Sequence, residues 1–193
     1  RSEQAYVGQD GWLYYRQGVD YLTSPSFYTS DEGRQGMQFQ VKRHEARQSD
    51  SVKALVDFRD QLAARGIELL VVPLPVKPMI EPEYFAGGFG APAEWPVLNN
   101  PGYEDWLERM TAEGLQVFDP SAFIAQRKRD REGPQFLKTD THWRPETMEA
   151  VASTVARHIK EEELLPQRPP AGYTQRQVSV THLGDIAEMV KFP

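Results

Sequence analysis

The sequence lacks cysteine altogether. This absence excludes disulfides, thiolate catalysis and cysteine-based metal sites. Histidine is scarce, with four residues in 193, and none stands in a metal-binding spacing such as His-Glu-x-x-His. A phosphate-binding loop is also missing, because the glycine-rich stretch AGGFG at 86–90 is not followed by Lys and Ser or Thr. We therefore expect neither a metal nor a cofactor.

Positive charge is in short supply. Lys and Arg number 22 against 28 Asp and Glu, a formal net charge of −6. This argues against nucleic acid as a partner, because such binding needs a basic face. No apolar run approaches the length that spans a bilayer, and the first residues are not typical of a signal peptide. The chain opens at Arg rather than Met, so we expect a trimmed start, with any membrane anchor outside the chain.

The remaining composition is that of a globular protein. Hydrophobic residues make up 39% and charged residues 26% of the chain, which is enough to bury a core. Two stretches repeat one pattern of helix, glycine and strand. Residues 50–66 predict a helix capped by Asp50 and followed by an apolar strand at 67–72, and residues 103–114 predict a helix followed by a strand at 115–119. The pattern predicts an α/β domain with a mainly parallel sheet flanked by helices.

Three further segments complete the predicted architecture. A third helix begins at Pro145 and extends to about residue 163, where three glutamates favour fraying. Residues 73–102 are rich in proline and predict a long irregular excursion from the carboxyl end of the first strand. Open α/β sheets bind ligands at that edge, so the excursion lies where we expect a substrate pocket. The basic run at 126–132 is typical of a solvated helix end.

The candidate chemistry lies in Asp140 and His142, just before the helix at Pro145. Side chains two residues apart in an extended segment leave the same face, so both can face one pocket. A carboxylate bonded to one imidazole nitrogen fixes the tautomer and leaves the other nitrogen to accept a proton near neutral pH. Asp-x-His alone is a weak signal. A structural reading stays open, in which Asp140 caps the turn and His142 is a satisfied, partly buried histidine.

Several motifs in order resemble the AlgJ/AlgX family of alginate O-acetyltransferases, whose catalytic domain is similar to SGNH hydrolases. They are GQDGWLYY at 8–15, IELLVVPLPVKPMIEPE at 67–83, KTDTHW at 138–143 and HLGDIAEMV at 182–190. Each motif alone has little specificity, but jointly they are specific, and the resemblance runs from about Val7 to Val190. It implies an SGNH hydrolase-like fold in which Asp140 is the orienting carboxylate and His142 the general base.

The resemblance also implies a serine nucleophile in a Gly-Asp-Ser-like segment downstream of the histidine. The Gly-Asp here is Gly184-Asp185, and it is followed by Ile186. The serines present stand in no such motif. We therefore expect residues 1–193 to be the N-terminal part of one incomplete SGNH-like domain, inactive by itself. The alternative is a non-catalytic polysaccharide-binding or complex-assembly module with the same fold.

The resemblance implies a periplasmic protein that works with an acetyl donor, a polysaccharide acceptor and other polysaccharide-acetylation proteins. A net charge of −6 gives no long-range attraction to alginate, a polyanion. Lys77, in the loop after the first strand, is a candidate contact for an acidic substrate, or else an exposed residue. We expect Trp143 to be structural, His44 and His158 to lie on the surface, and His182 to lie in a loop without a ligand role.

Overall fold

The computed structural model describes residues 4–28, 50–87, 97–130, 132–165 and 171–190. His44 lies outside the described residues. The helices and strands are β1 (Ala5–Val7), the 3-10 helix η1 (Gln9–Gly11), β2 (Leu13–Tyr15), α1 (Arg16–Thr23), α2 (Ser51–Ala63), β3 (Leu70–Val71), α3 (Lys77–Ile80), the 3-10 helix η3 (Pro82–Tyr84), α4 (Tyr103–Ala112), β4 (Gln116–Val117), α5 (Ser121–Arg129), α6 (Pro145–Glu161) and α7 (Asp185–Val190).

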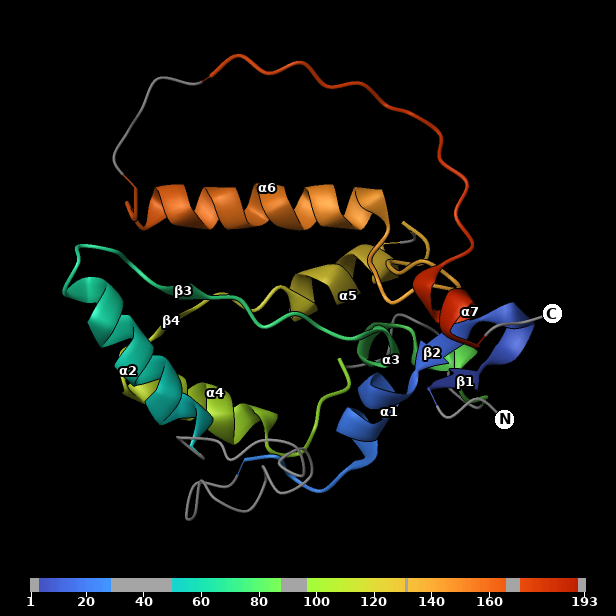
Figure 1. Cartoon of the computed structure of the whole chain (residues 1–193), viewed down its shortest axis with the longest axis horizontal. Coiled ribbons are helices and arrows are strands. Elements are labelled where there is room, and N and C mark those ends of the chain that lie inside the picture. The colour runs from blue at the N-terminus through green and yellow to red at the C-terminus, as the bar shows by residue number, and fades with distance from the viewer. Residues whose placement is uncertain (1–3, 29–49, 88–96, 131, 166–170, 191–193) are drawn as a thin grey trace.

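The centre of the fold is the parallel pair β3–β4. Leu70 pairs with Gln116 and Val71 with Val117. Helix α6 lies on one side of this pair, and α2 and α4 lie on the other (Figure 1). The α/β layering and the parallel pairing agree with the sequence prediction. The predicted strands at 67–72 and 115–119 are too long, however, because each pairs with one neighbour only and Pro73 has no N–H to extend the ladder.

The second sheet is an antiparallel hairpin, in which Ala5 pairs with Tyr15 and Val7 with Leu13. The two sheets are small and helices dominate the described residues, so the expected mainly parallel sheet is reduced here to two strands. Helix α7 packs its buried Ile186 and Ala187 against Ala5 and Leu13 of this hairpin. The sequence prediction did not include this helix. Its docking brings residues 185–190 beside the N-terminal hairpin and next to the candidate site.

The helix boundaries follow from local signals. The Asp50 side chain accepts hydrogen bonds from the amides of Val52 and Lys53 at 3.0 and 3.3 Å, as a helix N-cap does. Gly66 follows α2 with φ of +71°, a conformation that suits glycine best. Pro145 is the first residue of α6, as predicted. The basic residues of the run at 126–132 end α5 as predicted, but the end is not solvated throughout, because the Lys128 side chain is 10% exposed and pairs with Glu81 and Glu83.

The predicted irregular excursion at 73–102 is wrong for its middle part. Helix α3 and η3 occupy residues 77–84, while residues 88–96 lie outside the described part of the chain. Pro78 is compatible with the first turn of a helix, where a missing amide costs no hydrogen bond. Met79 and Ile80 are buried in a core cluster with Phe136 and Val151. Tertiary burial thus orders a stretch that is rich in helix-breaking proline.

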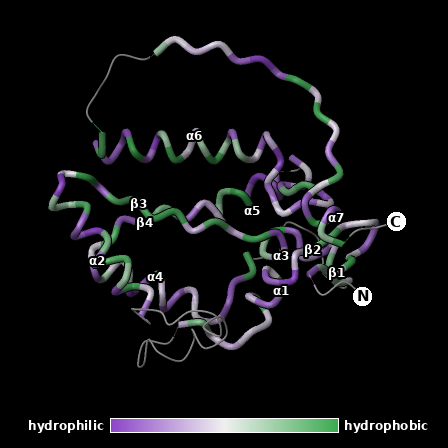
Figure 2. The backbone as a smooth tube through the Cα atoms, in the orientation of Figure 1, coloured by the Kyte–Doolittle hydropathy of each residue, from purple (hydrophilic) through white to green (hydrophobic). Residues whose placement is uncertain are grey.

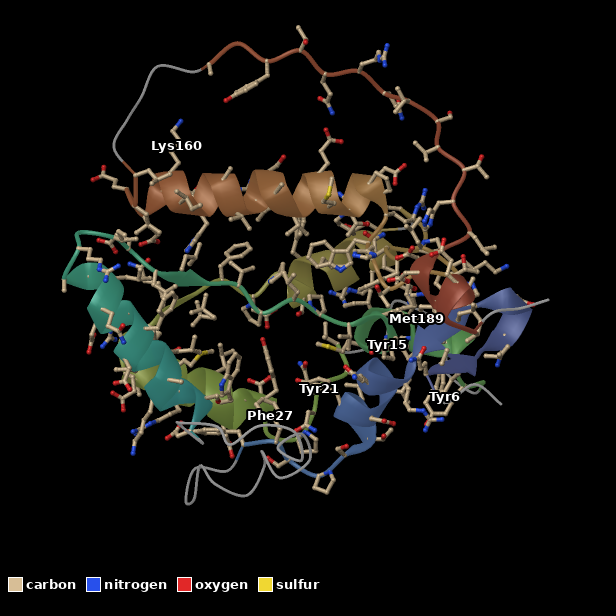
Figure 3. All side chains as sticks on the ribbon, viewed as in Figure 1. Tyr6, Tyr15, Tyr21, Phe27, Lys160 and Met189 are labelled. Carbon is tan, nitrogen blue, oxygen red and sulfur yellow. The ribbon has the colours of Figure 1, made fainter. Side chains whose placement is uncertain are left out.

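Helix α6 covers the sheet with one face and turns the other to solvent. His158 packs against Phe118 with ring centroids 5.1 Å apart and is half-buried, so the prediction of a surface histidine is wrong. The cause is helical periodicity, which places His158 on the same face as Val151 and Val155. Lys160 is exposed and points away from β3 and β4 (Figure 3). Figure 2 shows hydrophobic residues along β3, between the two layers.

None of the helices in the described ranges combines the length and the apolar character that crossing a membrane requires.

Candidate active site

A narrow hairpin joins α5 to α6 and carries the candidate residues at its tip. Phe136 and Trp143 form an antiparallel bridge, and the Leu137 amide donates to the His142 carbonyl at 3.0 Å. The Phe136 and Trp143 rings meet edge to face with centroids 6.4 Å apart, and Trp143 packs on the buried core cluster of α3, α5 and α6. Trp143 therefore has the structural position that its sequence predicts. The hairpin delivers Asp140 to a fixed place just before α6.

The tip of the hairpin is fixed from below by the N-terminal hairpin and α3. The carbonyl of Lys138 accepts from the Leu13 amide at 3.0 Å and from the Lys77 Nζ at 3.3 Å. The same Nζ donates to the Leu13 carbonyl at 2.8 Å. It also lies 5.6 and 5.5 Å from the ring centroids of Trp12 and Tyr14, close enough for cation–π attraction. One ammonium thus ties three segments of the chain together.

The placement of Lys77 corrects the sequence interpretation, which made it a substrate contact or an exposed residue. Lys77 is only 4% exposed. Burial lowers its pKa to about 8, although the carboxylates of Asp140, Asp185 and Glu81 act in the opposite direction. The ammonium donates to backbone carbonyls and aromatic rings surround it. Lys77 is therefore a support of the site and does not face a substrate.

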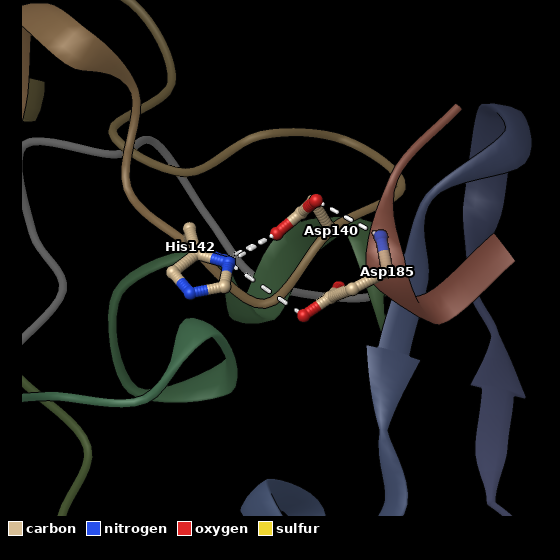
Figure 4. Close-up of side chains that lie close together, drawn as sticks. All are labelled: Asp140, His142 and Asp185. Atoms are coloured by element: carbon tan, nitrogen blue, oxygen red, sulfur yellow. Dashed lines mark hydrogen bonds and ion pairs between the residues drawn. The ribbon is translucent and has the colours of Figure 1, made fainter. Parts of the chain in front are cut away.

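Asp140 and His142 form a direct pair (Figure 4). The distance from Asp140 Oδ1 to His142 Nδ1 is 2.6 Å. The same oxygen accepts from the backbone amide of His142 at 2.9 Å. This second bond is that of an Asp closing a turn on its own backbone. The sequence predicts an extended segment, whereas the structure brings the two side chains together in a turn.

The carboxylate of Asp140 is buried and fully hydrogen-bonded. Its side chain is 7% exposed, and Oδ2 accepts from the Asp185 amide at 2.9 Å. Burial alone would raise the pKa of Asp140, but the amides of His142 and Asp185 and the imidazole together lower it to about 2. Asp140 is therefore an ionised acceptor at neutral pH, suited to orienting an imidazole.

The imidazole of His142 is engaged through Nδ1, and none of the described residues bonds to its Nε2. Its side chain is 76% exposed. The bond to Asp140 assigns the proton to Nδ1, which leaves the Nε2 lone pair available to accept a proton from a hydroxyl. The exposure of His142 contradicts its interpretation as a partly buried histidine. A role for Asp140 as a turn residue alone does not explain its bond to the imidazole. The geometry is that of a carboxylate-oriented general base.

A third residue, Asp185, completes the cluster and was missed by the sequence reasoning. Its Oδ1 accepts from the Thr141 amide at 2.7 Å, and its Oδ2 accepts from the Thr141 hydroxyl. His142 Nδ1 lies 3.6 Å from Asp185 Oδ2. The available signal was its place in the motif HLGDIAEMV, directly after a glycine.

His182 lies at the edge of this cluster. Its Nδ1 accepts from the Gly184 amide at 2.9 Å and stands 3.7 Å from Asp140 Oδ2. It is in a loop, as predicted, and its side chain is 59% exposed.

Asp140, His142 and Asp185 offer metal-ligand atoms within 4.8 Å of one another. However, both oxygens of Asp140 already accept N–H groups, so these contacts explain the cluster without an ion.

No serine hydrogen-bonds to His142 in the part of the chain that the structure describes. The hydroxyls of Ser24 and Ser26 donate to nearby backbone carbonyls, and that of Ser51 accepts from Trp106 at 3.1 Å. Among the described residues, the cluster around His142 therefore contains an imidazole and a bonded carboxylate, with no serine hydroxyl bonded to the ring.

A cavity of about 340 Å³ lies beyond the carboxyl end of β3. It is lined mainly by apolar side chains, and these include Pro73, Val76, Met79 and Trp106. The sequence predicts a pocket at this edge of the sheet, and residues 73–76 do contribute to one. Asp140 and His142 are not among its lining residues, so the pocket and the pair are separate features of the described chain.

The ionisation of Asp140 predicts an acid-dependent loss of stability. Its pKa falls from 3.8 to about 2 on folding, so its contribution is complete above pH 4 and disappears as the pH falls toward 2. We expect Asp140→Asn to be less stable than the natural protein by about 2 kcal/mol at pH 7. This gap should close between pH 4 and pH 2. Urea unfolding of both proteins across this range measures it, and a gap that stays constant to pH 2 contradicts the assignment.

Comparison with known proteins places this geometry in a family. Residues 5–193 match the family described as "SGNH hydrolase-like domain, acetyltransferase AlgX". Among curated relatives, the "Probable alginate O-acetylase AlgJ" of Pseudomonas aeruginosa is 29% identical over 180 residues, covering 93% of this chain and 39% of the relative. The protein of the same name from Pseudomonas fluorescens is 29% identical over 182 residues, with the same two shares. The chain thus spans about two fifths of the length of these relatives.

Two solved structures share the fold. The O-acetyltransferase domain of Pseudomonas putida AlgJ superposes with a TM-score of 0.64 at 22% identity, covering 98% of this chain and 58% of that one. Pseudomonas aeruginosa AlgX superposes with a TM-score of 0.51 at 24% identity, covering 81% of this chain and 32% of that one. These likenesses support the SGNH-like α/β fold, and the family match covers nearly every residue. The chain therefore belongs to the AlgJ/AlgX family of SGNH hydrolase-like alginate O-acetyltransferases.

Proposed function

We propose that the complete gene product containing this chain transfers acetyl groups to hydroxyls of an exopolysaccharide, alginate or a similar polymer. In this proposal His142 is the general base, Asp140 orients it, and a serine from outside residues 1–193 is the nucleophile. The observation that carries the proposal is the 2.6 Å bond between Asp140 Oδ1 and His142 Nδ1, which leaves an exposed Nε2. The family match supports the reaction class.

The chemistry proceeds in two acyl transfers. His142 Nε2 takes the proton of the serine hydroxyl as its oxygen attacks the acetyl carbonyl of the donor, and the departing donor oxygen takes that proton from the imidazolium. A sugar hydroxyl then attacks the acetyl-serine while Nε2 accepts its proton, and the serine oxygen leaves and recovers the proton. Asp140 stays ionised throughout and stabilises the imidazolium. No redox step is involved, so the proposal includes no cofactor.

The setting of the reaction belongs to the proposal as well. The curated relatives carry the name of alginate O-acetylases, which supports a polysaccharide acceptor and work alongside other polysaccharide-acetylation proteins. We propose a periplasmic location, where such a polymer would meet the site. Because the net charge of the chain is −6, long-range attraction cannot hold a polyanionic acceptor here. A local basic patch or another part of the protein must hold it.

A second candidate function is a non-catalytic polysaccharide-binding or assembly module. It is favoured by one observation, namely that no serine in the described ranges hydrogen-bonds to His142. Under this reading the Asp140–His142 pair is retained as a structural element of the turn. The two candidates differ in whether the complete gene product forms a covalent acetyl-enzyme.

Acetate release from p-nitrophenyl acetate by the complete gene product, compared with the 193-residue chain, tests the proposal. We expect turnover by the complete protein and none above background by the chain, since a base without a nucleophile gives no acyl-enzyme. A fluorophosphonate probe should label one serine of the complete protein and block turnover. Absence of turnover and labelling in the complete protein would support the module. Equal turnover by the chain would place the nucleophile within residues 1–193 and contradict the proposal.

A further inference from the structure

We propose that Asp185 is a positioning residue for the Asp140–His142 pair, which it holds in its reactive geometry by fixing the intervening Thr141. This inference rests on the proposed function, because positioning matters only if His142 acts as a base. It assigns a role in the site to the segment 182–187, which begins forty residues downstream of His142.

The contacts between Asp185 and the turn are reciprocal. The Asp185 carboxylate accepts both the amide and the hydroxyl of Thr141, the residue between the two members of the pair. In return, the Asp185 amide donates to Asp140 Oδ2 at 2.9 Å. The turn is therefore held from the side by bonds to its middle residue and to its first residue. Rotation of the Asp140 carboxylate away from the imidazole would break the bond from the Asp185 amide and also the bond from the His142 amide.

Distance decides between a positioning role and a direct one. Asp185 Oδ2 is 3.6 Å from His142 Nδ1, beyond a good hydrogen bond, whereas Asp140 Oδ1 is at 2.6 Å. Asp140 therefore accepts the imidazole proton, and Asp185 acts through Thr141. Figure 4 shows the two carboxylates on the same side of the imidazole, with Asp140 as the nearer partner.

Asp185 is itself firmly placed. It opens α7, whose Ile186 and Ala187 are buried against the N-terminal hairpin. The amide of Ala187 donates to the Thr139 carbonyl at 3.2 Å, and the Thr139 hydroxyl donates to the Leu183 carbonyl at 2.7 Å. A residue can fix the position of a catalytic group only if it is itself held rigidly. These buried and backbone contacts supply that rigidity.

The test compares Asp185→Ala, Asp185→Asn and the control Glu188→Gln in the complete gene product. Glu188 is also acidic, lies on α7 and is 62% exposed. We expect Asp185→Ala to lower kcat for p-nitrophenyl acetate by about 10- to 100-fold with KM within about 3-fold, because misplacement of a base by an ångström has an effect of this size. Asp185→Asn should recover most of the rate, since its amide oxygen still accepts from Thr141.

A spectroscopic readout separates this inference from the proposed function. The proton on His142 Nδ1, shared with Asp140, should give a downfield ¹H NMR signal that is absent in His142→Ala. We expect the signal to persist in Asp185→Asn and Glu188→Gln and to vanish in Asp185→Ala, whether or not the protein turns over the ester. If Asp185→Ala does not fold, Thr141→Val removes the hydroxyl bond alone and should weaken the signal.

Two results would overturn the positioning role. One is an unchanged signal and kcat in Asp185→Ala. The other is an Asp185→Asn variant as impaired as Asp185→Ala, since the charge and not the geometry would then be what matters. A protein that keeps the signal pattern but lacks turnover would leave the positioning intact and refute the proposed function instead.

Discussion

Replacing His142 by alanine in the complete gene product is expected to lower acetate release from an activated ester by about a thousand-fold or more. The reason is the geometry of the ring, whose Nδ1 is held by Asp140 at 2.6 Å and whose Nε2 edge is open. Removal of a general base costs about 10²- to 10⁴-fold, and removal of the histidine of a working triad costs more. Because the side chain is 76% exposed, folding should be almost unaffected.

The measurement is the initial rate of ester hydrolysis, with thermal unfolding recorded alongside. His158→Ala is the matched control, because His158 lies on α6 and packs on Phe118. It should keep the rate within about 2-fold, with a small loss of stability. Added imidazole should restore part of the activity of His142→Ala, since the vacated position is open to solvent. A His142→Ala protein with the natural rate would rule out the base assignment.

Replacing Gly184 by alanine is expected to undock the start of α7 from the turn that carries Asp140 and His142. Gly184 has φ of +100°, and a Cβ atom there would lie 2.3 Å from the Thr139 carbonyl oxygen. The positive φ is strained for any residue with a Cβ atom, and the Cβ would also clash with the Thr139 carbonyl. We expect a loss of about 2 kcal/mol or more in the free energy of unfolding. Since Asp185 follows directly, acetate release should also fall by about 100-fold.

Gly172→Ala supplies the control for this prediction. A Cβ at Gly172 would meet nothing within 4 Å, and its φ lies outside the left-handed region. Urea unfolding and ester turnover of the two variants, measured side by side, should separate a general effect of Gly to Ala from the loss of docking. If Gly184→Ala unfolds at the same urea concentration as Gly172→Ala and turns over the ester at the same rate, the close contact with Thr139 affects neither stability nor activity.

The features that could be predicted from the sequence are those with local causes. Asp50 marks the start of α2, and Pro145 marks the start of α6, because capping and first-turn preferences act within a few residues. The pairing of Asp140 with His142 is also local, and it was predicted even though the turn that achieves it was not. Strand lengths failed because they depend on the partner that each strand finds in space.

The parts of the site that were missed depend on contacts between distant residues. Asp185 meets Thr141 across 44 positions of sequence, and no periodicity or spacing reveals such a contact. Lys77 was interpreted as a surface or substrate residue because lysine is almost never fully buried unless it is paired. Here the carbonyls of Leu13 and Lys138 and two aromatic rings make its burial tolerable.

Because the Leu13 amide donates to the Lys138 carbonyl, a shortened chain that begins after β2 would lose a bond that fixes the turn at residues 139–142. The first strands of the chain thus support a turn that lies more than 120 positions later in the sequence. Removing these strands would expose the ammonium of Lys77, which donates to the Leu13 carbonyl. It would also remove the residues of the hairpin against which Ile186 of α7 packs. The amino-terminal hairpin is therefore part of the structure that holds the Asp140–His142 pair, and it is not a dispensable extension.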